Sequence, residues 1–151
     1  MIELLHEKYP EKHYVGLDLT PEMINIAQAK KLSNTEFVVG DSENLPFPEY
    51  SFDAVICSNS FHHYPNPQAF FNSAYQVLRK GGRLVLRDYT SSDLMVWLMN
   101  HLEMPLANLF GHGDVRIRKP AEFTAMAEKA GFTVLTMEKQ KGFRAHLVAR
   151  K

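Results

Sequence analysis

An acidic side chain follows the first predicted strand of the sequence. Asp18 ends the apolar run 14–18 and comes directly before Thr20-Pro21, a pair typical of a helix start. In open α/β sheets, ligands bind outside the carboxyl ends of the strands, where a carboxylate can accept hydrogen bonds from both ribose hydroxyls of an adenosine ligand. The alternative is that Asp18 only helps to cap the helix that follows. The spacing alone gives these two interpretations equal weight.

A second acid follows the next predicted strand, the apolar run 37–39, in the segment Gly40-Asp41-Ser42. A carboxylate beside exposed backbone N–H groups can bind an adenine edge, because it accepts from the amino group while an N–H donates to a ring nitrogen. Taken alone, this segment is better interpreted as a polar loop that Pro46 and Phe47 anchor. Its place after a strand, next to the strand of Asp18, favours a nucleotide site.

A glycine-rich phosphate loop is missing from the sequence. The Rossmann pattern places that loop roughly 20 residues before the acid, but only 17 residues precede Asp18 and no G-x-G-x-x-G occurs anywhere. The glycines at 81–82 and 111–113 stand in the wrong context. We therefore expect the first strand and its glycine turn to lie outside this chain, and residues 1–9 to begin partway along a helix.

Short apolar runs alternate with helical patterns along the chain, which predicts parallel strands joined by crossover helices. The predicted strands are 14–18, 37–39, 52–57 and 83–87. The predicted helix starts are Thr20-Pro21, Asn66-Pro67 and Pro120. The helix from Asn66 is expected to end at Lys80-Gly81-Gly82, a long helix over 93–110 to break near Pro105, and residues 132–138 and 143–150 to form an antiparallel hairpin.

The composition is that of one soluble domain. The 151 residues carry 17 basic and 17 acidic side chains, so no net charge would draw the chain to nucleic acid or to a membrane. No signal peptide or membrane span is evident, and the single Cys57 allows no internal disulfide. We expect a cytoplasmic protein that forms a single, N-terminally truncated domain over residues 1–151.

Five motifs, taken together and in order, identify a resemblance. They are 14–19, Gly40-Asp-Ser-Glu-Asn-Leu-Pro-Phe47, Ser51-Phe-Asp-Ala-Val55, Phe61-His-His63 and Val77-Leu-Arg-Lys-Gly-Gly-Arg-Leu84. The set resembles class I methyltransferases that use S-adenosylmethionine (SAM), in particular the methyltransferase 11 and quinone-biosynthesis group, over about residues 1–90. The resemblance implies a Rossmann-like α/β fold with a mostly parallel sheet, a C-terminal antiparallel hairpin and, here, no first strand.

The resemblance also implies roles for residues in the adenosine half of a SAM site. Asp18 corresponds to the acid that binds the ribose, and Leu19 would pack against the adenine. Asp41 corresponds to the residue that contacts the adenine amino group, and Ser42 would supply a backbone N–H beside it. Since the glycine loop has no counterpart, the residues that hold the methionine carboxylate and amino groups are not in this sequence.

The methyl-transfer half of the site is expected after the strand 52–57. By the same resemblance, Ser58 and Asn59 would lie near the methionine part of SAM and its methyl group. Ser58-Asn-Ser-Phe61 stands where enzymes that methylate amide or exocyclic nitrogens carry Asn/Asp-Pro-Pro-Tyr, which disfavours nucleic-acid bases and protein glutamine as substrates. His62 and His63 could act as acid or base, but a packing role is favoured, and no catalytic residue is assigned.

The predicted function is methyl transfer from SAM to a small, apolar or quinone-like acceptor. The alternative is a non-catalytic methyltransferase-like domain that acts through protein contacts or self-association, for example as a homodimer. A nicotinamide-dependent oxidoreductase has no positive signal, and no residue spacing predicts a metal site. The segment Arg116-Ile-Arg-Lys119 could bind an anion, although a solvated loop is the favoured interpretation.

A missing first strand would lie between the strands 14–18 and 52–57 in the sheet order of the family, 3-2-1-4-5-7-6. Each of these strands would then expose an unpaired edge. Three arrangements would resolve this: a longer natural protein, direct pairing of the two strands, or another chain that covers the gap. The first is favoured.

Overall fold

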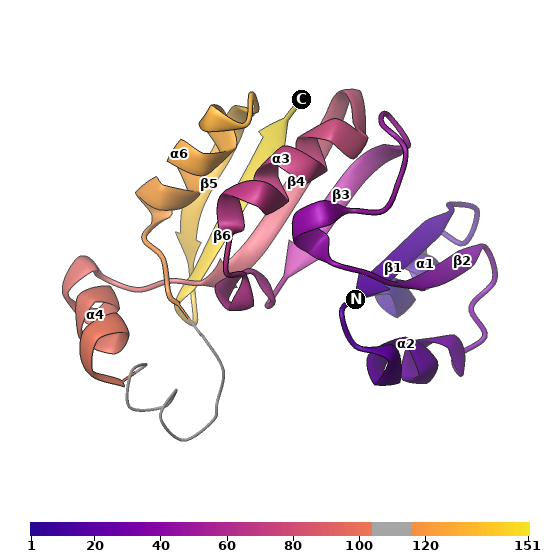
Figure 1. Cartoon of the computed structure of the whole chain (residues 1–151), viewed down its shortest axis with the longest axis horizontal. Helices are drawn as coiled ribbons and strands as arrows, with labels where there is room; N and C mark the ends of the chain where they lie inside the picture. The colour runs from indigo at the N-terminus through magenta and orange to yellow at the C-terminus, as the bar shows by residue number, and fades with distance from the viewer. Residues whose placement is uncertain (104–115) are drawn as a thin grey trace. The chain divides into compact units, whose positions relative to one another are not determined.

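The structure, a computed structural model, describes residues 1–103 and 116–151. The chain divides into two compact units, residues 1–46 and residues 47–151, each built around its own sheet (Figure 1). Of the described helices, none is both long enough and apolar enough to cross a membrane.

The first unit is built on two parallel strands, β1 (Tyr14–Asp18) and β2 (Thr35–Val39), paired from Tyr14 with Thr35 to Asp18 with Val39. Its helices are α1 (Ile2–Lys8), α2 (Pro21–Gln28) and the 3-10 turn η1 (Ser42–Asn44). The predicted helix start is confirmed, because Thr20 is the N-cap of α2 and proline follows it. Gly16 allows close packing on β1: a Cβ there would lie 2.6 Å from the ring of Phe37 and 2.9 Å from Ile2 Cδ1.

The second unit contains a four-stranded mixed sheet in the order β3-β4-β6-β5. Strands β3 (Phe52–Ser58) and β4 (Leu78–Tyr89) are parallel, while β6 (Arg144–Arg150) is antiparallel to both β4 and β5 (Thr133–Gln140). Helices α3 (Pro67–Val77) and α6 (Pro120–Lys129) begin where predicted. The α/β class and the C-terminal antiparallel hairpin are therefore confirmed.

One face of this sheet is the core of the second unit. Helices α3 and α6 lie along the same face (Figure 1). Beneath them the rings of Phe61, Phe71 and Phe123 pack with aliphatic residues of the strands, and all are buried. The aliphatic members at the centre of the sheet are Leu84, Leu86 and Leu147.

The predicted end of the helix from Asn66 is wrong. Helix α3 ends at Val77, and Leu78 already has an extended backbone and begins β4. Leu78 is fully buried and pairs with Phe52, and Gly81 and Gly82 exchange backbone hydrogen bonds of 3.0 Å with Lys151. Pairing within the sheet therefore takes up residues that look like a helix end, although Gly81 still has the positive φ of 79° that favours glycine.

The apolar segment after β4 changes from α-helical to π-helical geometry at Met99, before the predicted break. Helix α4 (Asp93–Leu98) continues as a π-helical turn, η3 (Met99–Glu103). There the side chain of Asn100 donates to the carbonyl of Ile117 at 2.7 Å and accepts from its N–H at 3.0 Å. The predicted break near Pro105 lies outside the described residues.

Truncating Phe71 tests the core of the second unit. We expect Phe71→Ala to lower the free energy of unfolding by about 3–5 kcal/mol, because a fully buried ring leaves a cavity among Phe61 and Phe70. Phe143→Ala is the control, since that ring is 71% exposed, and it should change the value by less than about 0.5 kcal/mol. Urea unfolding of both variants measures the difference, and equal losses would contradict this account of the core.

Candidate functional site

The strand ends of the first unit bring the two predicted adenosine-binding acids to one edge. The N–H of Gly40 donates to the carbonyl of Asp18 at 2.9 Å and joins the ends of β1 and β2. Oδ1 of Asp18 accepts from the N–H of Thr20 at 2.9 Å and from its hydroxyl at 2.8 Å. Asp18 thus braces the helix start, while its second oxygen, Oδ2, accepts no hydrogen bond from the described residues.

Asp41 plays a similar part at the end of β2. It is the N-cap of η1, and its Oδ1 accepts from the N–H of Glu43 at 2.8 Å. The N–H of Ser42 is the first of this turn and has no acceptor within it. Leu19 is 70% exposed beside Asp18. The first unit therefore offers, at one edge, two carboxylates of which only Oδ1 accepts hydrogen bonds from the described residues, together with an N–H donor and an exposed apolar side chain.

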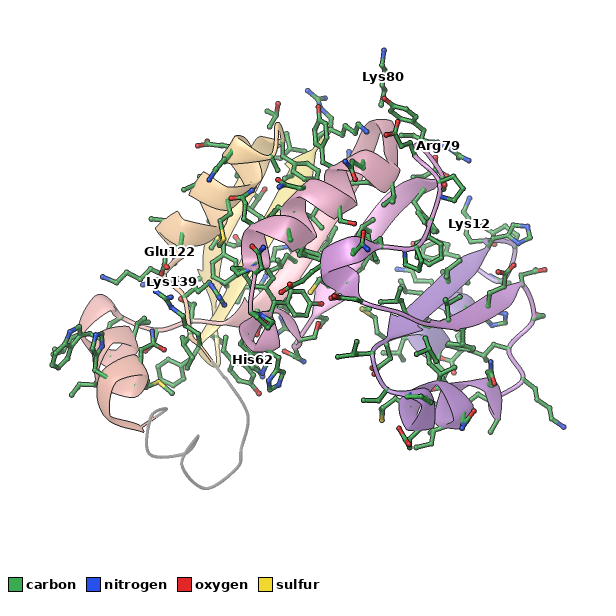
Figure 2. The ribbon with its side chains drawn as sticks, viewed as in Figure 1. Lys12, His62, Arg79, Lys80, Glu122 and Lys139 are labelled. Carbon is green, nitrogen blue, oxygen red and sulfur yellow. The ribbon has the colours of Figure 1, made fainter. Side chains whose placement is uncertain are left out.

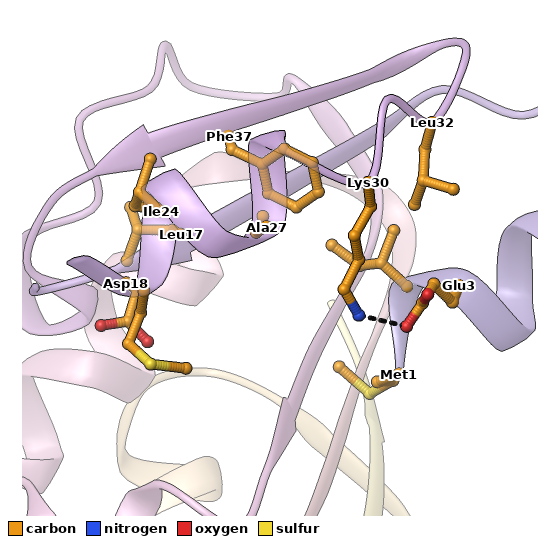
Figure 3. A pocket seen from close by; sticks show the side chains of 12 residues that line it. Met1, Glu3, Leu17, Asp18, Ile24, Ala27, Lys30, Leu32 and Phe37 are labelled. Carbon is orange, nitrogen blue, oxygen red and sulfur yellow. Dashed lines mark hydrogen bonds and ion pairs between the residues drawn. The ribbon is translucent and has the colours of Figure 1, made fainter. Parts of the chain in front are cut away.

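An apolar pocket of about 250 Å³ lies within the first unit (Figure 3). Asp18 is at one end of it, Lys30 and Glu3 form an ion pair at its rim, and apolar side chains line the rest. Those side chains include Leu17, Ile24, Ala27 and Phe37. Of the six predicted cofactor-binding residues, only Asp18 lines this pocket.

The other two predicted cofactor-binding residues belong to the second unit. Ser58 is the last residue of β3, and Asn59 follows it with a φ of +56°, a left-handed conformation that asparagine tolerates. The N–H of Asn59 donates to the carbonyl of Arg87 at 2.9 Å, which ties it to the neighbouring strand β4. Both residues therefore lie at the carboxyl edge of the four-stranded sheet.

A histidine–aspartate pair stands at the same edge. The ring Nδ1 of His62 lies 2.7 Å from Oδ1 of Asp88, the backbone N–H of His62 donates to Oδ2 at 2.9 Å, and the N–H of Tyr89 donates to Oδ1 at 2.6 Å. Because the carboxylate only accepts, Nδ1 carries a proton, and in the neutral ring Nε2 then presents its lone pair. Asp88 is 1% exposed and the His62 side chain 11% exposed, so the ring is held in one orientation.

This pair changes the interpretation of the two histidines. Figure 2 shows His62 at the end of the sheet where β3 and β4 finish. Its ring contacts His63 with centroids 4.0 Å apart and meets Tyr89 edge-on at 5.1 Å. Partial removal from water and the neighbouring His62 lower the pKa of His63. The arrangement resembles the base and orienting acid of a catalytic pair, rather than packing alone.

Asp88 was not among the predicted site residues. The signal was available, because Asp88 directly follows the predicted strand 83–87, and Asp18 stands in a similar place as the last residue of the predicted strand 14–18. Its partner His62 lies 26 residues earlier in the chain. The sequence pattern gives no distance between them.

Cys57 and Arg118 occupy apolar surroundings near this edge. Burial raises the pKa of the Cys57 thiol, and its sulfur lies 3.3 Å from the hydroxyl of Ser60. Arg118 was expected in a solvated loop, but it is 5% exposed and its guanidinium lies 5.2 Å from the centre of the Phe61 ring. Within the described residues, no three His, Cys, Asp or Glu side chains gather as metal ligands would.

The family model and the curated relatives that match this chain are described as methyltransferases. A family model described as a methyltransferase domain matches residues 1–86, more than half of the chain. The chain is 44% identical over 81 residues to a phthiotriol/phenolphthiotriol dimycocerosates methyltransferase of Mycobacterium leprae, covering 53% of this chain and 30% of that protein. It is 39% identical over 83 residues to a demethylmenaquinone methyltransferase of Thermotoga maritima, covering 55% and 36%.

A fatty-acid O-methyltransferase of Mycolicibacterium smegmatis is 37% identical over 98 residues, which cover 64% of this chain and 36% of that protein. The chain thus spans about a third of the length of these curated relatives.

Solved structures show the same fold. A putative methyltransferase of Haloferax volcanii, in complex with the methyltransferase activator Trm112, superposes with a TM-score of 0.80 at 19% identity, over 98% of this chain and 77% of that one. A putative methyltransferase of Bacillus halodurans gives a TM-score of 0.75 at 24% identity, over 93% and 83%.

The single cysteine reports on this edge of the sheet. Because its pKa is raised and its side chain is buried, we expect Cys57 in the native chain to react with a disulfide reagent at pH 8 at least about 100-fold more slowly than in urea. The release of the coloured thiolate measures both rates. A native rate close to the unfolded rate would contradict the described burial of Cys57.

Proposed function

This chain belongs to the class I SAM-dependent methyltransferase family, and we propose that it takes part in methyl transfer from SAM to a small-molecule acceptor. The observation that carries this proposal is the His62–Asp88 pair, with a buried acid and a free Nε2, at the strand edge that also presents Ser58 and Asn59.

The residues at the strand ends suit a SAM molecule. Oδ2 of Asp18 is available for the ribose hydroxyls, and Asp41 with the N–H of Ser42 for the adenine edge. Leu19 would cover the adenine, and Ser58 and Asn59 would lie near the methionine part. When bound, SAM supplies a methyl group on a positively charged sulfur. The chain's own part is to position the adenosine and the acceptor, because methyl transfer depends mainly on alignment.

His62 can remove a proton from the acceptor. An acceptor that takes the methyl group from bound SAM would have to lose the proton on its attacking atom. The proton that leaves the acceptor would pass to Nε2 of His62, and Asp88 would stabilise the imidazolium through Nδ1. This role suits an acceptor whose attacking atom carries a proton, such as a hydroxyl group.

An apolar or quinone-like acceptor agrees with the surface of α4. Leu94, Met95 and Trp97 are all exposed on this short helix of the second unit. The relatives are named for demethylmenaquinone, a fatty acid and phthiotriol dimycocerosates. A flexible, polarizable methionine beside an indole ring suits contact with such groups.

A non-catalytic role is the second candidate. In this case the chain would act through protein contacts, for example as a homodimer. Binding of S-adenosylhomocysteine, the product that SAM becomes after methyl transfer, separates the two candidates.

Asp18→Asn tests the adenosine site. The amide oxygen can keep the hydrogen bonds to Thr20, whereas the charge and the second acceptor for the ribose are lost. We expect the affinity for S-adenosylhomocysteine, measured by calorimetry, to fall by about 10- to 100-fold.

Thr20→Val is the matched control for that variant. It removes the hydroxyl that Asp18 accepts from but leaves the carboxylate intact, so the affinity should stay within about threefold. If the unaltered chain does not bind S-adenosylhomocysteine at all, the non-catalytic candidate is favoured. If Thr20→Val weakens binding as much as Asp18→Asn does, Asp18 acts only through the helix start.

His62→Gln tests the proposed base. We expect kcat to fall by about 10²- to 10⁴-fold with unchanged binding of S-adenosylhomocysteine. The assay follows labelled methyl transfer from SAM to a short-chain demethylmenaquinol or to a fatty acid. His63→Gln is the control and should retain most of the activity, because His63 has no contact with Asp88 comparable to that of His62. Equal activity of His62→Gln and the parent chain would exclude His62 as the base.

A further inference from the structure

The sheet of the second unit has a face that no described helix of that unit covers. Burial alternates along β6, where Ala145, Leu147 and Ala149 are buried beneath α3 and α6 and the residues between them are not. We call the opposite side the open face. Its members on β4 and β6 are Arg83, Val85, Arg87, Tyr89, Arg144, His146, Val148 and Arg150.

The register groups basic side chains at the carboxyl end of β4. Arg87 is paired with His146, and Tyr89 is paired with Arg144. Paired residues of antiparallel strands point to the same face, with Cβ atoms about 4.5–5.5 Å apart. Two guanidinium groups and one imidazole therefore share a small area at the edge where the His62–Asp88 pair also lies.

Two buried polar atoms of this group have no partner. Nη1 of Arg144 and Nδ1 of His146 are buried, yet neither makes a hydrogen bond among the described residues. A buried polar atom without a hydrogen-bond partner is unfavourable, because burial has removed the hydrogen bonds that it makes to water. The guanidinium of Arg144 lies 3.6 Å from the centre of the Tyr89 ring, which holds its plane in place but satisfies no N–H.

Among the described residues of the second unit, no ion pair neutralises the charges of this group. The Arg87 side chain is exposed and takes part in no hydrogen bond or ion pair among the described residues. Glu138 is the acid of the next strand, paired with His146, but it accepts from Gln140 at 3.0 Å and lies in no ion pair there. Positive charge therefore exceeds negative charge, among the described residues, around an unused donor of Arg144 and an unpartnered ring nitrogen of His146.

We propose that Arg144, His146 and Arg87 form a binding site for an oxyanion, a carboxylate or a phosphate group. The planar guanidinium of Arg144, fixed on Tyr89, would donate to two oxygens, Nδ1 of His146 would donate to the anion when it carries the proton, and Arg87 would contribute charge from the rim.

The position of the site suggests where the anion comes from. The Tyr89 ring that holds Arg144 also contacts the His62 ring, with centroids 5.1 Å apart. If the chain transfers methyl groups as proposed above, the oxyanion belongs to the acceptor, and among the apolar acceptors named there this favours an acid, such as a fatty acid, over a quinol. Binding of the anion itself does not depend on that function.

Titration of the chain with inorganic phosphate and, separately, with succinate tests the site. Calorimetry gives the affinity, and ¹H–¹⁵N spectra of the histidine rings report on His146. We expect millimolar or tighter binding of one of the two anions, a shift of the His146 ring signals, and at least about a tenfold loss of affinity in Arg144→Gln. Preferential binding of phosphate points to a phosphorylated ligand, and preferential binding of succinate to a carboxylic acid.

Arg150→Gln is the matched control, because Arg150 lies on the same face of the same strand, at the opposite end and paired with Arg83. Its affinity should stay within about twofold of the parent. Arg144→Lys keeps the charge without the planar donor and should bind with intermediate affinity, and thermal melts check that each variant folds. Absence of binding of both anions at millimolar concentration, or equal losses in Arg144→Gln and Arg150→Gln, would overturn the site.

The same titration in Asp18→Asn separates this proposal from the function above. Anion binding should persist in that variant, since Asp18 belongs to the first unit. A chain that binds phosphate or succinate but not S-adenosylhomocysteine would retain the oxyanion site and lose the methyl-transfer function.

Discussion

The buried carboxylate of Asp88 is the constraint on which this edge of the second unit depends. A charge that is 1% exposed must be satisfied within the protein, and three donors meet this need: the N–H and ring of His62 and the N–H of Tyr89. These bonds fix the start of the turn after β3 and the orientation of one imidazole. They also hold Tyr89, the last residue of β4, so the end of this strand is linked through Asp88 to the turn after β3.

Much of this fold could be predicted from local signals. Thr20 and Asn66 each precede a proline and act as N-caps, because capping depends on a few neighbouring residues. The C-terminal hairpin is likewise visible in its alternation. The end of α3 could not be predicted, because Lys80-Gly81-Gly82 has the composition of a helix end and only pairing with Lys151 and β3 draws it into a strand.

The candidate site could be predicted to a smaller extent. Asp18 and Asp41 were suggested by their place after strands, and the structure joins these strand ends through Gly40 and Asp18. The roles of His62 and Asp88 depend on a contact between residues that are 26 positions apart in the sequence. Neither composition nor hydrophobic periodicity predicts such a contact. The burial of Arg118 could not be predicted either, since nothing in a run of basic residues indicates that one of them packs on Phe61.

Successive side chains of a strand point to opposite faces of the sheet, so the end of β4 can contribute both to the proposed base and to the proposed oxyanion site. Asp88 faces the helices and orients His62, whereas its neighbours Arg87 and Tyr89 must face the other side. Tyr89 still contacts His62 by its edge and holds Arg144 on its face, so it connects the proposed base with the proposed oxyanion site. An acceptor held at Arg144 and deprotonated at His62 would be fixed at two points. Since methyl transfer depends on alignment more than on acid–base strength, fixing the acceptor at two points is the contribution that this edge of the sheet is best built to make.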